Sequence, residues 1–360
     1  MSKKIRRVFN WTLIFTFSFV IVFIILKQNH EKIDEEKVNW EARNAIRINN
    51  IKRVCEKYNL GIYKNHKDDG KNIIKYPPTP QYSVFYIVKK YDLSYCPIYK
   101  AASTTWLYNI CLLMRIPEAE LSSGREQIST IARRVIPELD YPEAEEAMQD
   151  TTKLLVVRHP FERLLSAYRD KLENSIAGRQ HGTLHFYRKY GSAIVKKYRG
   201  NDFVKPRDDQ VIHPINLPKP AGIEPTWSEF VDYIIDTELE SYGDDHWMPY
   251  YLFCTPCSLN YSLVAKVETL YQDQLFAFEK LGLSQLIKPH WKHKVGISNA
   301  ARIYFKQLNI SQVNRLYNKY KLDFEMFAYS VDEYFQFTHD YATEENPFEV
   351  DFFSDVYDNE

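Results

Sequence analysis

The sequence lacks the glycine-rich loop with which most nucleotide triphosphatases hold phosphate groups. None of its 11 glycines belongs to a G-x-x-x-x-G-K-[ST] motif, and no acidic residue after a later predicted strand is placed to hold Mg²⁺. The chain also has no internal repeat and no long low-complexity tract. These absences argue against a kinase and leave one large α/β domain as the expectation.

Cysteine is scarce as well, with five residues in 360. This number is small for a disulfide scaffold but suits an enzyme of an oxidising compartment. Cys254 and Cys257 could pair locally, whereas Cys55 could stay free or link two chains. A zinc site would need two further ligands beside Cys254 and Cys257, and His246 alone does not complete one, so no metal ion is expected.

No lysine or arginine follows Lys321, although the whole chain has 47 basic and 47 acidic side chains. Residues 322–360 hold 12 of the acidic side chains, so the rest of the chain is strongly basic and suits anionic partners. Eight basic residues lie in residues 179–207, where Asp202 is the only acid. This segment is either a solvated helix face or one wall of a groove for an anionic acceptor.

The stretch LLVVRHPFERLLSAYRDK, residues 154–171, predicts a buried strand, a turn and an amphipathic helix. The apolar run 154–157 is short and partly β-branched, which favours a strand, and Pro160 suits the first position of a helix. Arg158 and Ser166 then lie near the start of this helix, where proteins commonly bind anions. An ordinary helix with a charged face is the alternative.

Another junction of the same kind lies upstream, in residues 93–110. In chain order it is the first junction, and residues 154–171 form the second junction. A strand-like stretch leads into the sequence KAASTT, residues 100–105, and then into an apolar helix pattern. Its lysine would contribute an ammonium group, and Ser103, Thr104 and Thr105 would contribute hydroxyls beside the free N–H groups of a helix start. Such a set suits a phosphate group, although Ser and Thr at helix starts often serve only as caps.

In this order, the two junctions resemble the carbohydrate sulfotransferases of the Golgi, and most of all the chondroitin and dermatan 4-sulfotransferase family. The family pattern R-x-P-F-E-R-L-x-S-A-Y/F-R-D-K is present almost whole in residues 158–171. Of the looser pattern P-K-x-x-C-T/S-N-W-K, residues 99–107 keep the lysine, a threonine and the tryptophan. The similarity covers about residues 82–330, because four further segments match: 245–249, 254–257, 265–270 and 320–329.

The resemblance implies an α/β, P-loop-like sulfotransferase fold, in which a central and mostly parallel sheet is flanked by helices. It also implies that the sulfate donor is 3′-phosphoadenosine 5′-phosphosulfate (PAPS), with the 5′-phosphosulfate at the first junction and the 3′-phosphate at the second. Lys100 would be catalytic, as the cation on the bridging oxygen of the leaving nucleotide. The expected donor-binding residues are Tyr99, Lys100, Ala101, Ala102, Ser103, Thr104, Thr105, Arg158, Arg163 and Ser166.

The acceptor hydroxyl needs a general base, and His246 is the first candidate because it lies in the family-like segment 245–249. A purely structural role for His246 is the alternative. His159 suits the role less, since it lies inside the second junction. The reserve candidates are His181, His185, His213, Glu162 and Asp244.

The function implied by the resemblance is transfer of a sulfuryl group to a hydroxyl of a glycan. A glycosaminoglycan such as chondroitin is expected, with the 4-O position of N-acetylgalactosamine as the best single choice. The anionic glycan would bind along residues 179–207; no nucleic-acid partner is expected, and a homo-oligomer stays open. The alternative is a catalytically inactive glycan-binding protein of the same fold.

Four strands and three helices are expected to frame this site. The helices would begin near Thr104, Pro160 and Thr226, and the last of these starts with the capping-box sequence TWSE. The ligand would bind at the carboxyl ends of the strands, as in doubly wound sheets. The strands are expected at residues 82–88, 93–99, 153–157 and 263–267.

The N-terminus predicts a membrane anchor. Basic residues precede an apolar stretch from about Trp11 to Leu26, which places residues 1–10 in the cytosol and makes 11–27 a signal-anchor helix. A cleaved signal peptide is the alternative, but its small-residue cleavage site is missing. Beyond the anchor we expect a stem (28–80), a lumenal sulfotransferase domain (81–335) and an acidic C-terminal tail (336–360).

This topology predicts a single-pass type II protein of the Golgi membrane with a lumenal catalytic domain. Two N-glycosylation sequons, at Asn260 and Asn309, agree with a lumenal location.

Overall fold

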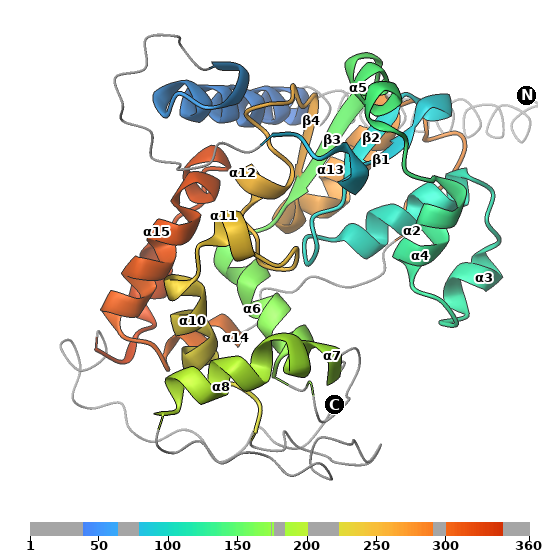
Figure 1. Cartoon of the computed structure of the whole chain (residues 1–360). Coiled ribbons are helices and arrows are strands. Elements are labelled where there is room, and N and C mark those ends of the chain that lie inside the picture. Colours follow the sequence, from blue (N-terminus) through green and yellow to red (C-terminus); the bar gives the residue numbers. More distant parts are fainter. Residues whose placement is uncertain are drawn as a thin grey trace, which may run out of the picture. The chain divides into compact units, whose positions relative to one another are not determined.

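The computed structural model describes residues 39–63, 79–173, 175, 184–200, 223–290 and 300–340 (Figure 1). The chain divides into two compact units, Met1–Ile46 and Arg47–Glu360. Of the first unit, residues 39–46 are described and are helical. The second unit begins with helical residues 47–57 and contains the sheet.

A four-stranded sheet lies at the centre of the second unit, in the order β1 (Tyr86–Val88), β2 (Leu93–Cys96), β3 (Thr152–Val157) and β4 (Leu263–Lys266). Strands β2, β3 and β4 are parallel, whereas β1 runs antiparallel to β2. The sheet is therefore mixed, and the expected parallel arrangement holds for three neighbouring strands. Nearly all strand residues are buried, which is typical of a sheet covered on both faces.

Two strands are shorter than the sequence pattern predicted. Residues 82–84 form a 3-10 helix, η2 (Tyr82–Val84), so only the end of the first predicted strand is extended. Strand β2 ends at Cys96 instead of continuing to residue 99. The next residue, Pro97, has no N–H to donate to a neighbouring strand. The third and fourth strands are confirmed to within one residue.

Helices form the connections between the strands (Figure 1). The β2–β3 connection contains α2 (Ser103–Leu113), α3 (Glu118–Ser122), α4 (Ile128–Val135) and α5 (Tyr141–Asp150). Between β3 and β4 lie α6 (Pro160–Lys171), α7 (Leu184–Phe186), the π-helix η4 (Tyr187–Gly191), α8 (Ser192–Tyr198), α10 (Trp227–Asp236), α11 (Leu239–Tyr242) and α12 (Tyr250–Phe253). After β4 come η6 (Val267–Thr269), α13 (Leu270–Lys280), α14 (Ala300–Phe305), α15 (Ile310–Met326) and α16 (Asp332–Gln336); two further 3-10 helices are η1 (Gly61–Tyr63) and η3 (Lys89–Tyr91).

The predicted helix starts are confirmed. Helix α6 begins at Pro160, whose missing N–H would have had no partner at that position anyway. Helix α10 starts with the predicted capping box: the Thr226 side chain accepts from the Glu229 N–H, and the Glu229 carboxylate accepts from the Thr226 N–H. Helix α2 begins at Ser103, one residue before the expected start.

An aromatic core fixes α6 in place. Its apolar face packs with α10, α14 and α15, and Figure 1 shows these helices gathered on one side of the sheet. The ring of Phe161 lies 4.9 Å from that of Phe324 and 5.2 Å from that of Phe305. Burying one such side chain stabilises the fold by about 1.5–3 kcal/mol. The start of α6, which follows Arg158, is therefore held rigidly.

Two disulfides correct the expectations for the cysteines. Cys55 pairs with Cys257 and Cys96 pairs with Cys254, so neither a local Cys254–Cys257 bond nor an interchain bond through Cys55 is present. Cys111 is free and buried. The bonds join positions 202 and 158 residues apart, which the spacing of the cysteines could not reveal.

Residues 47–63, which the sequence analysis placed in the stem, belong to the second unit and are tied to it. Arg47 donates to the Asp273 carboxylate at 2.6 Å and to the Val264 carbonyl of β4. Asn50 donates to two carbonyls at the end of α15, and Lys57 pairs with Glu325 at 2.8 Å. The folded domain therefore begins well before residue 81.

Within the ranges that the structure describes, no helix is both long and apolar enough to cross a membrane. The predicted anchor, residues 11–27, lies outside those ranges.

We predict that peptide mapping of the unreduced protein will recover the linkages Cys55–Cys257 and Cys96–Cys254. Cys111 should react with alkylating reagents only after unfolding, because burial raises the pKa of its thiol to about 12. Replacing Cys96 and Cys254 together by serine should lower the free energy of unfolding by about 2–5 kcal/mol. Recovery of a Cys254–Cys257 linkage would contradict the structure. In the measurement of unfolding free energy, the matched control is Cys111→Ser, which replaces a cysteine that forms no disulfide.

Candidate active site

The loop between β2 and α2 has an unusual backbone. Lys100 and Ala102 have φ angles of 66° and 61°, in the left-handed region that side chains with a Cβ rarely adopt. Each such residue costs about 1–3 kcal/mol, and such residues cluster at functional sites. No side chain caps the N-terminus of α2, which the loop leads into. The loop is therefore shaped to present Lys100 and the start of α2 together.

The turn between β3 and α6 places Arg158 against this loop. One Arg158 Nη donates to the Lys100 carbonyl at 3.4 Å, and the other contacts the Glu162 carboxylate at 3.3 Å. The buried Tyr250 hydroxyl holds the Arg158 backbone, because it donates to the Arg158 carbonyl at 2.6 Å and accepts from its N–H at 3.4 Å. The two predicted junctions thus meet, since β2 and β3 are parallel neighbours.

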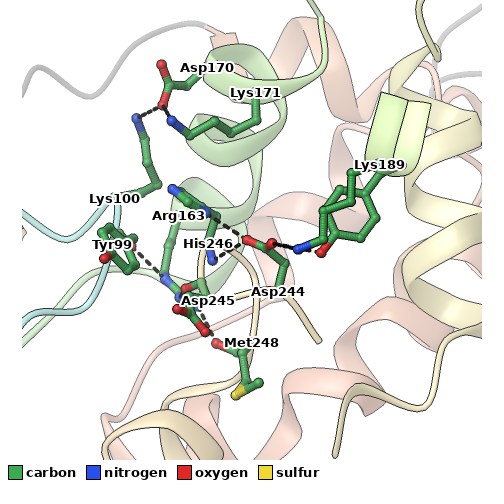
Figure 2. Close-up of polar contacts among 11 residues, drawn as sticks. Tyr99, Lys100, Arg163, Asp170, Lys171, Lys189, Asp244, Asp245, His246 and Met248 are labelled. Carbon is green, nitrogen blue, oxygen red and sulfur yellow. Dashed lines mark hydrogen bonds and ion pairs between the residues drawn. The ribbon is translucent and has the colours of Figure 1, made fainter. Parts of the chain in front are cut away.

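Arg163 lies beneath the site. Its side chain is 2% exposed, and its guanidinium donates to three carbonyls: Tyr99 at 2.9 Å, Met248 at 2.7 Å and Asp245 at 2.9 Å (Figure 2). The sequence analysis placed Arg163 among the donor-binding residues. Because its guanidinium is buried and donates to three backbone carbonyls, Arg163 instead positions the loops around it.

Two lysines converge on one carboxylate at the end of α6. The Asp170 Oδ2 accepts from Lys100 Nζ at 3.0 Å and from Lys171 Nζ at 3.1 Å (Figure 2). Burial lowers the pKa of Lys100, and Asp170 counteracts this effect. Burial also pushes the pKa of Asp170 upward, but the two lysines outweigh it and keep that pKa below its usual value.

His246 is oriented by a carboxylate. Its Nδ1 lies 2.7 Å from the Asp244 Oδ1, while the other oxygen of Asp244 accepts from the Tyr190 hydroxyl at 2.8 Å. Burial raises the pKa of Asp244, but hydrogen bonds from His246 and Tyr190 outweigh it and hold that pKa well below its usual value. Because Asp244 is ionised, Nδ1 carries the proton and Nε2 is the basic nitrogen.

Two aromatic rings hold the imidazole of His246. The Tyr99 ring stacks on it at 4.7 Å, and the Phe186 ring meets it edge-on at 5.2 Å. Tyr99 directly precedes Lys100, so the donor-side loop and the candidate base are adjacent. Phe186 belongs to the described part of the basic segment, residues 184–200, which therefore borders His246.

The remaining hydroxyls of the predicted site differ in exposure. Ser103 is buried, Thr104 is exposed and Ser166 is half-buried, and all three belong to the first two turns of α2 or α6. Thr105 is 3% exposed, which makes its hydroxyl less accessible than that of Thr104. Ala101 is buried, so its contribution to a ligand would come from the backbone.

His159 has a structural role. Its Nδ1 accepts from the Phe161 N–H as the N-cap of α6, and its Nε2 lies 2.8 Å from the Ser330 carbonyl. Its ring stacks on Tyr334 at 4.7 Å, and burial lowers its pKa to about 4. Both nitrogens are engaged, which agrees with the expectation that His159 suits the role of general base less than His246.

The other reserve bases that the structure describes are less well placed than His246. His185 is exposed, and His181 and His213 lie outside the described residues. Glu162 pairs with Arg158 and accepts from the Tyr334 hydroxyl at 3.2 Å, and burial raises its pKa. The geometry therefore favours His246.

The family-like segment 265–270 joins the second junction to the end of α15. The Glu268 carboxylate accepts from the His159 N–H at 2.7 Å and from the Tyr329 hydroxyl at 2.9 Å. Lys266 donates to the Phe327 carbonyl and lies over the Tyr329 ring at 4.0 Å. These contacts support the site without entering it.

The two sequons differ in their surroundings. Asn260 is exposed in the loop before β4. Asn309 is half-buried and caps α15, because its side chain accepts from the Gln312 N–H at 2.8 Å. Among the described residues, no three His, Cys, Asp or Glu side chains gather as a metal site.

A family model decides what kind of protein carries this site. The model of the sulfotransferase family matches residues 83–330, which is more than half of the chain. The chain belongs to the sulfotransferase family. This result confirms the resemblance found in the sequence motifs. The matched residues, 83–330, nearly coincide with the range of about 82–330 over which the motifs lie.

Several relatives of this sulfotransferase-family chain are named carbohydrate sulfotransferases. Carbohydrate sulfotransferase 11 of Mus musculus is 31% identical over 259 residues, covering 68% of this chain and 66% of the relative. Carbohydrate sulfotransferase 9 of Homo sapiens is 27% identical over 313 residues, covering 85% and 63%. Carbohydrate sulfotransferase 8 of Homo sapiens is 28% identical over 261 residues, covering 70% and 57%. In each case the match covers less than two thirds of the relative's own length. No solved structure matches the chain.

The sulfotransferase family implies PAPS as the donor, and the residues present fit it. The N-terminus of α2 has eleven helical residues behind it and no side-chain cap, which suits a phosphate group. Lys100 and Lys171 share one carboxylate, which leaves an excess positive charge for an anion. Asp170 and Lys171 belong to the family pattern in residues 158–171, but the sequence assigned neither of them to the site. The ion pair between Asp170 and Lys100 depends on the fold.

We predict that Arg163→Lys will destabilise the sulfotransferase domain by about 2–4 kcal/mol, because one ammonium group cannot donate to three carbonyls in the geometry of a guanidinium. The loss should appear as a lower thermal unfolding midpoint. Arg169→Lys is the matched control, since Arg169 is exposed on the same helix. If Arg163→Lys had normal stability but lost donor binding, Arg163 would be a ligand after all.

Proposed function

We propose that the chain is a PAPS-dependent carbohydrate sulfotransferase, which transfers a sulfuryl group to a hydroxyl of a glycan. One observation carries this proposal: the fold brings Arg158 of the second junction to the Lys100 carbonyl of the first. The two motifs that resemble donor-binding segments thus form one site. The names of the relatives support a carbohydrate acceptor.

In this proposal the two junctions divide the donor between them. The N-terminus of α2, with Ser103, Thr104 and Thr105, holds the 5′-phosphate, and Tyr99, Ala101 and Ala102 shape the loop before it. Arg158 and Ser166 hold the 3′-phosphate. Arg163 acts indirectly, because it anchors the Tyr99 carbonyl below the loop.

Lys100 would stabilise the charge that develops during transfer. When bound, PAPS supplies the sulfuryl group and leaves as adenosine 3′,5′-bisphosphate. Lys100 donates a hydrogen bond to the bridging oxygen of this leaving group, where negative charge grows. The Asp170 carboxylate holds the Lys100 ammonium group at 3.0 Å before the donor arrives, so little reorganisation is needed.

His246 would remove the proton of the acceptor hydroxyl through Nε2. Asp244 keeps the proton on Nδ1 and stabilises the imidazolium that forms, as a carboxylate beside a histidine does in other enzymes. Tyr99 and Phe186 hold the ring between the donor loop and the basic segment.

The basic segment would bind the acceptor. Arg188, Lys189, Lys196 and Lys197 are exposed within residues 184–200, and Lys189 lies 3.4 Å from Asp244. These cations suit the carboxylates and sulfates of a glycosaminoglycan. Chondroitin, at the 4-O position of N-acetylgalactosamine, remains our specific choice, and it rests on the sequence resemblance.

The cellular setting is part of the proposal. Two disulfides support an oxidising compartment, as expected for a lumenal domain. The proposed arrangement is a single-pass type II protein of the Golgi membrane, anchored by residues 11–27 and glycosylated at Asn260 and Asn309.

We predict that the full-length chain, purified in detergent, will transfer labelled sulfate from PAPS to one of a panel of desulfated glycans that includes chondroitin, dermatan and heparan. Arg158→Ala and Lys100→Ala should each reduce transfer by about 100-fold or more. Arg169→Ala, on the exposed face of α6, is the control. Donor binding without transfer to any glycan would favour the inactive glycan-binding alternative, and a chain that does not bind PAPS would overturn the proposal.

We predict that His246→Ala will lower kcat by about 10²- to 10⁴-fold while leaving the affinity for adenosine 3′,5′-bisphosphate unchanged, because His246 acts on the acceptor. His185→Ala, on the same basic segment, should retain full activity. Wild-type turnover in His246→Ala would exclude it as the base.

A further inference from the structure

The Asp170 carboxylate joins Lys100, from the β2–α2 loop, to Lys171, at the end of α6. Both ammonium groups donate to the same oxygen, Oδ2, at 3.0 and 3.1 Å (Figure 2). The three side chains are only 23%, 16% and 16% exposed. The contact is therefore shielded from water, and it fixes two cations whose Cα atoms belong to different segments.

The positive charges around this point are not equivalent. Arg163 is buried and donates to three backbone carbonyls, and Arg158 has the Glu162 carboxylate as its partner. Lys100 and Lys171, by contrast, share a single negative charge. The excess positive charge of the site therefore lies on these two lysines, where an anion would bind.

Lys171 also faces the acceptor side. Its Nζ lies 5.2 Å from the centroid of the Phe186 ring, over its face, and the same ring meets His246 edge-on at 5.2 Å. Lys171 thus contacts Asp170, the partner of Lys100, and also the ring that borders the candidate base.

We propose that Asp170 is a positioning residue that holds Lys100 and Lys171 as a paired ammonium site for the sulfuryl group in transfer. Lys171 is then a second cation of that site, besides Lys100. The proposal rests on the proposed function. A sulfuryl group spreads its negative charge over three oxygens, so two fixed cations stabilise it better than one mobile cation.

The pairing has a consequence for pH dependence. The charged groups that face Lys100 are Asp170 and Lys171 of α6 and Arg158 of the preceding turn. Burial and the two cations lower the pKa of Lys100, and Asp170 alone raises it. Without Asp170, Lys100 should lose its proton at a lower pH, so activity should decline earlier as the pH rises.

The test is Asp170→Asn in the full-length chain, measured for kcat, KM for PAPS, pH profile and affinity for adenosine 3′,5′-bisphosphate, which lacks the sulfuryl group. We expect kcat to fall by about 10- to 100-fold and the alkaline limb of the pH profile to move to lower pH. The bisphosphate affinity should hold or rise, because a negative charge has been removed. Glu173→Gln, which removes one charge just beyond the end of α6, is the control and should match the wild type.

Lys171→Met provides a second variant in case Asp170→Asn does not fold, because methionine keeps the length of the side chain without its charge. It should also lower kcat with little change in bisphosphate affinity, and the double variant should lose less than the product of the two single losses.

The outcomes separate this inference from the proposed function. A wild-type chain that neither binds the bisphosphate nor transfers sulfate overturns both. The inference alone is overturned if the wild-type chain binds the bisphosphate and transfers sulfate, but Lys171→Met and a folded Asp170→Asn keep the wild-type kcat and pH profile. A loss of activity that follows a loss of bisphosphate binding also overturns the inference alone.

Discussion

Three backbone carbonyls from two separate loops converge on the buried guanidinium of Arg163. The Tyr99 carbonyl belongs to the loop that carries Lys100, and the Asp245 and Met248 carbonyls flank His246. Arg163 itself belongs to α6, which begins just after Arg158. A single side chain therefore ties the candidate donor loop and the candidate base to the same helix. If this contact were lost, each segment would keep its local fold, but their relative positions would no longer be fixed.

This constraint explains how the basic residues of one motif can have different roles. Arg163 is 2% exposed and donates to three backbone carbonyls, so its guanidinium is turned toward the protein interior although it lies in a motif of anion-binding character. Arg158 keeps part of its capacity, since it contacts one carbonyl and one carboxylate at 3.4 and 3.3 Å. The lysines at the end of α6 and before α2 share one carboxylate and retain the excess charge. Whether a basic residue of this motif is structural or can bind an anion therefore depends on the partners of its side chain, and not on its residue type.

Sequence reasoning predicted the parts of the fold that depend on local patterns. The run 154–171 gave a correct strand, turn and helix because its apolar spacing, its proline and its buried face agree. The pairing of Cys55 with Cys257 could not be predicted, since it depends on how residues 47–63 return to the domain. The same reason hid the role of Arg163: its spacing predicts a helix face, whereas its partners come from residues more than 60 positions away.

The two histidines nearest the motifs show the same limit for the site. In the sequence, His159 and His246 each lie in a family-like segment, beside an arginine and an aspartate respectively. In the structure, His159 has both nitrogens engaged by the backbone, and burial lowers its pKa to about 4. His246 has a carboxylate on Nδ1 and rings on either side, an arrangement that makes Nε2 basic and holds it in one direction. A general base needs this combination of one anchored nitrogen and one available nitrogen. Asp244 is a neighbour of His246 in the sequence, but the rings of Tyr99 and Phe186 come from other segments. The tertiary fold is therefore needed to distinguish the two histidines.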